Sequence, residues 1–169
     1  MTEPVLDVAA FDALPADVAG DLLRPACASA AWLAAVVARR PYADVHELWA
    51  ASDEVLSALP WTEIEQAMAA HARIGERAGG AEREAAWSRE EQAGAATSGT
   101  DSAAALHRGN LAYERRFGHV FLICATGRSA EQLLAALHER LDNDADTEQH
   151  VVRTELAAIV RLRIARVLA

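Results

Sequence analysis

A capping signal followed by a leucine stripe lies near the C-terminal end of the sequence and predicts a helix there. The segment RSAEQLLAALHERLDND, residues 128–144, places Ser129 and Gln132 in the spacing of a capping box. The leucines behind it recur at the intervals of one helix face: Leu133, Leu134, Leu137 and Leu141. We therefore predict a helix that begins after Ser129 and packs its leucine face against a core.

The remainder of the chain uses the same residue types. Apolar residues make up 52% of the 169 positions, with alanine supplying much of that share, and aromatic residues only 5%. Alanine and leucine favour helices, and the usual strand formers are sparse. A chain of this length fits one domain with a substantial core. The predicted fold is all-α, a compact single-domain bundle of about seven to eight helices over residues 1–169.

Similar patterns predict the remaining helices and their breaks. Helices are expected at 7–22 with a break at Pro15, at 29–39, 44–59, 61–74 and 102–116, and from Ser88 onward. Thr62 and Glu65 would cap the helix at 61–74, and Ile64, Met68 and His71 would share one of its faces. A polar loop is expected over 75–86 and an interruption over 97–102. Residues 118–126, GHVFLICAT, are the one strand-like run and are predicted as an extended or short helical segment.

The last predicted helix begins with Asp146 or Thr147 as its cap. Its apolar face is formed by Val152, Leu156, Ile159, Val160, Ile164 and Val167. Arg161, Arg163 and Arg166 lie in its last turns, where positive charge suits the helix dipole.

Charge and cysteine content restrict the partners and the compartment. The net charge of -9 argues against nucleic acid and gives no reason to expect attraction to anionic lipid. No run of residues approaches the roughly 20 apolar residues of a membrane span. The N-terminus is acidic where a signal peptide is basic. Cys27 and Cys124 both have apolar neighbours and are predicted to be buried, reduced thiols. We therefore expect a cytoplasmic protein that binds neither nucleic acid nor membrane.

Common metal and nucleotide motifs are missing from the sequence. No two of the six histidines stand four residues apart, and no Glu-x-x-His pair occurs. The chain also lacks a Gly-x-Ser-x-Gly elbow and a phosphate loop. We therefore expect no bound metal ion. A metal site whose ligands come from separate helices stays open as an alternative.

His71 and the segment WSREEQAG, residues 87–94, carry the remaining candidate chemistry. A histidine titrates near neutral pH and can act as an acid or a base, but His71 could equally be a core histidine with a satisfied partner. Ser88 and Glu91 have capping-box spacing, so they could begin a helix or belong to a polar site. A capping box leaves Gln92 unexplained.

Three blocks in this order resemble one enzyme family. The sequence is similar to the 2-oxo-4-hydroxy-4-carboxy-5-ureidoimidazoline (OHCU) decarboxylases of urate degradation. The similarity lies in three blocks, which are HARIGER, WSREEQAG and NLAYERRFGHVFLICATGRSAEQLLAALHERLDND. CASAAWLAAVVARRPYADVHEL also resembles the early helices of that family, with its Arg-Pro-aromatic turn at 40–42. The resemblance covers nearly the whole chain.

The resemblance implies an all-α homodimer without a cofactor that converts OHCU to (S)-allantoin. His71 would be the catalytic histidine, with Glu91 as its partner. The positions implied to contact the substrate are Ala72, Ser88, Glu91, Gln92, Phe121, Leu122, Ile123, Cys124, Ala125 and Arg128. Contacts from 121–125 would be made largely by backbone groups.

Two positions differ from the family pattern. Ala72 stands where the family usually has proline after the histidine, so the turn loses a fixed φ. Thr126 stands where many members have arginine, and Arg128 follows two residues later. Two alternatives therefore stay open: a catalytically inert dimerisation or scaffold module of the same fold, and a decarboxylase of a related ureido acid.

Overall fold

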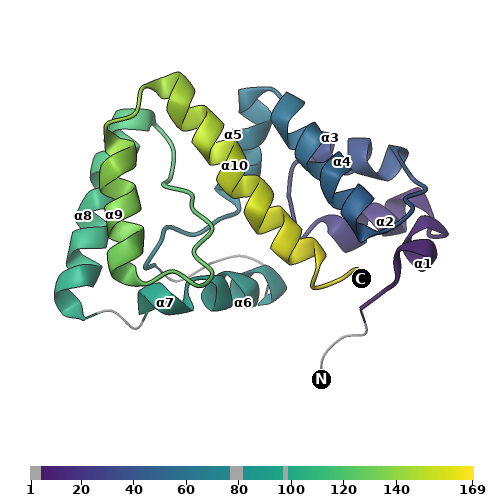
Figure 1. Ribbon diagram of the computed structural model, residues 1–169, viewed down its shortest axis with the longest axis horizontal. Coiled ribbons are helices and arrows are strands. Elements are labelled where there is room, and N and C mark those ends of the chain that lie inside the picture. Colours follow the sequence, from purple (N-terminus) through teal and green to yellow (C-terminus); the bar gives the residue numbers. More distant parts are fainter. Residues whose placement is uncertain (1–4, 77–81, 97–98) are drawn as a thin grey trace. The chain divides into compact units, whose positions relative to one another are not determined.

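Ten α-helices and no strand make up the regular structure of the described residues, 5–76, 82–96 and 99–169, in the computed structural model (Figure 1). Eight of these helices have seven or more residues, so the predicted all-α class is confirmed and the predicted number of helices roughly fits. None of the helices in the described ranges is long and apolar enough to cross a membrane.

The chain forms two compact units. The first contains the described residues up to Ala67 together with Ala157–Ala169, and the second is Met68–Leu156. The single-domain assignment over residues 1–169 stays a prediction.

The first unit is built from the N-terminal helices and the end of the last helix. Its helices are α1 (Val8–Asp12), α2 (Ala16–Leu23), α3 (Ala30–Ala38), α4 (Val45–Ala58) and most of α5 (Trp61–Ala69). Ser29 caps α3, and Asp44 caps α4. Trp32 is completely buried, and its indole N–H donates to the Ser52 hydroxyl at 3.1 Å. The predicted break at Pro15, the start of the second predicted helix and both ends of the third are confirmed to within one or two residues.

The second unit contains α6 (Glu82–Glu91), α7 (Ala93–Ala96), α8 (Thr100–Phe117), α9 (Ala130–Leu141) and α10 (Ala145–Ile164) as far as Leu156. Helices α8 and α9 pack side by side (Figure 1). A β-carbon at Gly109 would lie 2.7 Å from the Leu137 side chain, so the glycine allows this close approach. The predicted capping box is confirmed, because Ser129 and Gln132 each bond the other's backbone N–H.

The residues between α8 and α9 form no regular element. Residues 119–125 have neither helix nor strand assignment, as expected for an extended segment without a strand partner. Phe121, Leu122, Ile123 and Ala125 are buried, so the segment crosses the interior of the unit. Of the two predicted buried thiols, Cys27 is buried, but Cys124 is partly exposed.

Four sequence-based boundaries are wrong. Helix α5 ends at Ala69, so His71 lies in the following turn and shares no helix face with Ile64 and Met68. Thr62 is inside α5, because the Pro60 carbonyl already accepts from the Glu63 amide at 3.0 Å. The last helix begins at Ala145, and its cap is Asp144, whose carboxylate accepts from the Thr147 amide at 2.7 Å. The fourth concerns Ser88.

Ser88 does not begin a helix. Helix α6 begins at Glu82, and Ser88 is therefore an interior residue whose carbonyl accepts from the Gln92 amide at 3.1 Å. The predicted polar loop over 75–86 is wrong from residue 82 onward, and its residues 77–81 lie outside the described part. Glutamate, arginine and alanine are good helix formers, and they extend the helix N-terminally past Ser88. The capping-box interpretation of Ser88 and Glu91 is therefore wrong.

The apolar face predicted for the last helix is confirmed. Val152, Leu156, Ile159, Val160, Ile164 and Val167 are all buried, although Val167 lies just beyond the helix end. Arg161 pairs with Asp53, and Arg163 is buried and donates to the Pro25 carbonyl at 3.3 Å.

Candidate active site

His71 lies in a turn of the second unit that follows α5. His71 is half-buried, and its backbone N–H donates to the Met68 carbonyl at 2.9 Å. Two residues of α8, Asn110 and Glu114, hold the turn. Asn110 of α8 donates from its side-chain amide to the Ile74 carbonyl at 2.9 Å. Arg73 forms a bidentate ion pair with Glu114, also of α8. The position of His71 is therefore set by α8 as well as by its own chain neighbours.

Gln92 connects this turn to the end of α6. Its side-chain oxygen accepts from the Gly75 amide at 3.0 Å, and its side-chain nitrogen donates to the Ala72 carbonyl at 3.4 Å. The family's proline would restrain the turn by fixing φ. Alanine at this position lacks that restraint, and the two hydrogen bonds from Gln92 hold both ends of the same turn. Part of the hydrogen-bonding capacity of Gln92 is therefore used inside the protein.

Ser88 and Glu91 share one face of α6. A separation of three residues places side chains as neighbours on a helix, and both residues are buried, with 5% and 8% exposure. A serine and a glutamate that are buried together in a helix interior make a polar patch inside the unit. Helix α6 therefore brings the side chains of Ser88 and Glu91 together, whereas the sequence showed only that they are three residues apart. The predicted pairing of Glu91 with His71 stays a prediction.

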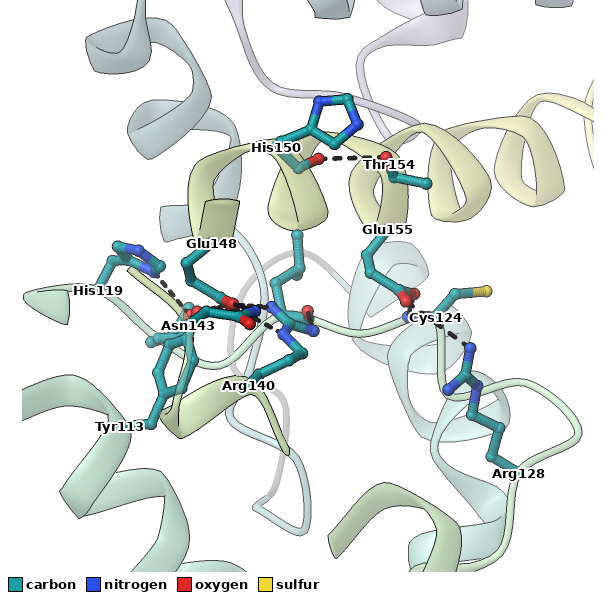
Figure 2. A network of polar contacts seen from close by, with 12 residues as sticks. Tyr113, His119, Cys124, Arg128, Arg140, Asn143, Glu148, His150, Thr154 and Glu155 are labelled. Atoms are coloured by element: carbon teal, nitrogen blue, oxygen red, sulfur yellow. Dashed lines mark hydrogen bonds and ion pairs between the residues drawn. The ribbon is translucent and has the colours of Figure 1, made fainter. Parts of the chain in front are cut away.

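The segment 121–125 is held by charged residues that sequence reasoning missed. Arg140 of α9 donates from Nη1 to the Leu122 carbonyl at 2.8 Å, and Glu155 of α10 accepts from the Cys124 amide at 2.8 Å. Glu155 also lies 3.7 Å from the Arg128 guanidinium (Figure 2). A sequence signal existed, because Arg140 follows Leu133 and Leu137 at helical spacing and Glu155 adjoins the Val152–Leu156 face. A charge within an apolar stripe indicates a buried polar partner.

A buried ion-pair cluster holds Arg140 itself. Glu148 of α10 is completely buried and accepts from Arg140 Nε at 2.8 Å and from Nη2 at 2.6 Å. Asn143 donates to the second Glu148 oxygen at 2.9 Å, and the Tyr113 hydroxyl also donates to Glu148 (Figure 2). Burial, followed by the hydrogen bond to Glu148, raises the pKa of Tyr113, so its hydroxyl stays protonated.

Electrostatics link α6 with the 121–125 segment. The pKa of the Cys124 thiol is raised, mainly by burial and further by the carboxylates of Glu155 and Glu91, while Arg128 opposes the rise. The charges of Glu91 and Arg128 thus act on the same thiol in opposite directions. A raised pKa keeps Cys124 a neutral thiol near pH 7, so the residue is a poor nucleophile.

Gly94 provides a direct backbone contact between the end of α6 and the turn at Arg128. A β-carbon at Gly94 would overlap the Arg128 carbonyl oxygen. Together with Gln92 and the charges around Cys124, this contact brings the WSREEQAG block against both the His71 turn and the segment 121–128. Among the described residues, no three His, Cys, Asp or Glu side chains form a group that could hold a metal ion.

We expect Gly94→Ala to reduce both stability and activity. The added methyl group must push the backbone of the Arg128 turn away, and overpacking of this kind costs about 1–3 kcal/mol. Urea denaturation measures the loss of stability, and kcat/KM measured on the folded fraction reports the displaced turn. Gly20→Ala is the matched control, because a β-carbon there meets no atom within 4 Å. Equal stability of the two variants would contradict the close contact.

Comparison with known proteins identifies the family. The OHCU decarboxylase family model matches residues 12–165. A 2-oxo-4-hydroxy-4-carboxy-5-ureidoimidazoline decarboxylase of Amia calva is 33% identical over 133 residues, which cover 78% of this chain and 76% of the relative. The uric acid degradation bifunctional protein TTL of Arabidopsis thaliana is 39% identical over 70 residues, 40% of this chain and 22% of that protein.

Solved structures show the same fold. A crystal structure of OHCU decarboxylase in the presence of (S)-allantoin has a TM-score of 0.73 and 25% identity, covering 86% of this chain and 95% of the other. An (S)-allantoin synthase structure has a TM-score of 0.76 at 16% identity, covers 98% of this chain and 54% of the other, and supports the fold alone. Because the family match spans most of the sequence and the Amia calva relative is aligned over most of its length, this chain belongs to the OHCU decarboxylase family and is a decarboxylase.

Proposed function

We propose that the protein decarboxylates OHCU to (S)-allantoin in urate degradation, without a cofactor. The observation that carries the proposal is the convergence of the three sequence blocks within one unit. Gln92 binds the His71 turn, Gly94 contacts the Arg128 carbonyl, and Glu91 influences the Cys124 thiol. Family membership supplies the reaction class, and the relatives' names supply the substrate.

The chemistry of the substrate fits a site made of side chains and backbone groups alone. OHCU carries a hydroxyl and a carboxylate on one ring carbon, and a C=N bond adjoins that carbon. When the bond to the carboxylate breaks, its electron pair moves into the ring and the C=N nitrogen accepts the displaced pair. Carbon dioxide leaves and the C=N nitrogen takes up a proton; the resulting enol then becomes the carbonyl as its hydroxyl loses a proton and the neighbouring carbon gains one. The substrate thus provides its own electron sink.

In this mechanism His71 is the acid–base residue that acts on the proton of the substrate hydroxyl. Glu91 orients the imidazole and stabilises its charged form, which is the usual effect of a carboxylate beside a histidine. Ser88 and Gln92 hydrogen-bond the ureido and ring amides, and Ala72 and the segment Phe121–Ala125 contact the substrate largely through the backbone. Arg128 is a further contact to the substrate. Protonation from one face sets the chirality of allantoin.

The direct test is to incubate the protein with freshly generated OHCU. We expect OHCU to disappear faster than in the spontaneous reaction and the product to be (S)-allantoin, as followed by circular dichroism. Absence of acceleration would refute the proposal and favour an inert module of the same fold. Acceleration with a related ureido acid but not with OHCU would identify a different substrate.

The homodimer is a further part of the proposal and follows from the family resemblance. Sedimentation velocity at micromolar concentration measures it, with a dimer expected at twice the 18.1 kDa chain mass. A monomer under these conditions would contradict it.

A further inference from the structure

We propose that Glu155 and Arg140 are positioning residues that present the backbone N–H and C=O of Ile123 to the substrate. This inference rests on the proposed function, which places segment 121–125 at the substrate. It goes further in naming one residue of that segment as the hydrogen-bonding group and two charged side chains as the cause of its orientation. Neither side chain has to contact the substrate.

The first observation is that the two charged residues hold successive peptide groups. Arg140 Nη1 donates to the Leu122 carbonyl at 2.8 Å, on the peptide that precedes Ile123. A carboxylate oxygen of Glu155 accepts from the Cys124 amide at 2.8 Å, on the peptide that follows Ile123. Figure 2 shows Arg140 and Glu155 approaching the segment from α9 and α10.

Peptide geometry then determines where the groups of Ile123 point. Within the described residues the one cis peptide bond is Arg40–Pro41, so both peptides at Ile123 are trans. In a planar trans peptide the C=O and N–H bonds point in opposite directions. The Ile123 N–H therefore points away from Arg140, and the Ile123 C=O points away from Glu155. The described part of the chain provides neither group with a hydrogen-bond partner.

These backbone groups have a chemical preference. Ile123 is 3% exposed, and a buried backbone donor and acceptor are normally paired. A ligand with its own amide N–H and C=O can satisfy both. The ureido group and the cyclic amide of OHCU and allantoin belong to this class.

Both positioning residues are themselves restrained. The Arg140 side chain is 8% exposed and pairs with Glu148, which is completely buried, and its guanidinium lies 4.6 Å from the centre of the Phe121 ring. The Glu155 side chain is 17% exposed and its other oxygen lies 3.7 Å from Arg128. Held side chains of this kind keep the peptides in one orientation without the substrate.

The test uses Glu155, because removal of Arg140 would leave the Glu148 charge buried. Glu155→Ala removes the acceptor for the Cys124 amide, whereas Glu155→Gln keeps an oxygen at the same place. We expect kcat/KM for OHCU to fall about 10-fold or more in Glu155→Ala, because small displacements of binding groups have effects of this size. Glu155→Gln should recover most of the loss. Thr154→Ala is the matched control, because its hydroxyl donates to the His150 carbonyl of its own helix.

Amide NMR of the full chain separates positioning from a general structural role. Addition of (S)-allantoin should shift the Ile123 amide resonance in the wild-type protein and in Glu155→Gln, and less in Glu155→Ala. Urea midpoints should be similar in all four proteins. If the wild-type protein is active and Glu155→Ala has the same kcat/KM, the inference is overturned. An equal loss of kcat/KM in Glu155→Gln and Glu155→Ala would also overturn it, as would an Ile123 amide resonance that allantoin does not shift. An inactive wild-type protein would instead refute the proposed function.

Discussion

Replacement of His71 by asparagine is expected to lower kcat for OHCU decarboxylation by about 10²- to 10⁴-fold, the usual contribution of general acid–base catalysis. Asparagine keeps a polar side chain in the turn but cannot transfer the hydroxyl proton. The measurement follows OHCU loss by absorbance and the handedness of allantoin by circular dichroism. Any remaining product should approach a racemate, because the spontaneous reaction supplies it.

Controls separate the loss of chemistry from the loss of fold. His138 is an exposed histidine of α9, and His138→Asn should retain full activity. The urea midpoint of His71→Asn should stay close to that of the wild-type protein. If His71 and Glu91 act as a unit, Glu91→Gln should cost little in the His71→Asn background, although it is costly alone. Near-normal stereospecific turnover in a folded His71→Asn variant would refute the role assigned to His71.

Arg140→Met is expected to lower the free energy of unfolding by about 3–5 kcal/mol, as is typical when one partner of a buried ion pair is removed. Glu148 is completely buried, and without Arg140 the described residues leave its charge with the hydrogen bonds from Tyr113 and Asn143. The Leu122 carbonyl also loses its donor. Urea denaturation followed by far-ultraviolet circular dichroism measures the change.

Two further variants make this prediction specific. Arg115 is exposed on α8, and Arg115→Met should change stability by less than about 0.5 kcal/mol. The double variant Arg140→Met/Glu148→Leu removes both charges and should be more stable than Arg140→Met alone. A single Arg140→Met variant as stable as the wild-type protein would show that the cluster contributes nothing.

Two of the three capping-box patterns predicted for this chain show how far local sequence determines a helix start. Ser129 and Gln132 follow a glycine and a turn, and they do cap α9. Ser88 and Glu91 have an equivalent spacing, but residues 82–87 ahead of them are already helical. A separation of three residues brings side chains together both at a helix start and in a helix interior. The preceding residues decide between the two, and EREAA favours a helix.

The candidate site was only partly predictable for a related reason. His71, Ser88, Glu91 and Gln92 drew attention as chemically versatile residues in recognisable blocks. The residues that hold these blocks in place were not predicted from the sequence. Gln92 meets Gly75 from 17 residues away, and Glu155 meets Cys124 from 31 residues away. Each of these bonds joins a side chain to a distant backbone group, and even where a charge stands in an apolar stripe the sequence does not show which group is its partner.

The sequence by itself determined the all-α class, most of the helix ends and the apolar faces of α9 and α10, because these follow from hydrogen bonds and side-chain contacts within four residues. Only the tertiary structure decided that Gly94 contacts the Arg128 carbonyl and that Arg140 and Glu155 hold the peptides around Ile123. Those outcomes depend on which helices pack together, and packing is a property of the whole chain.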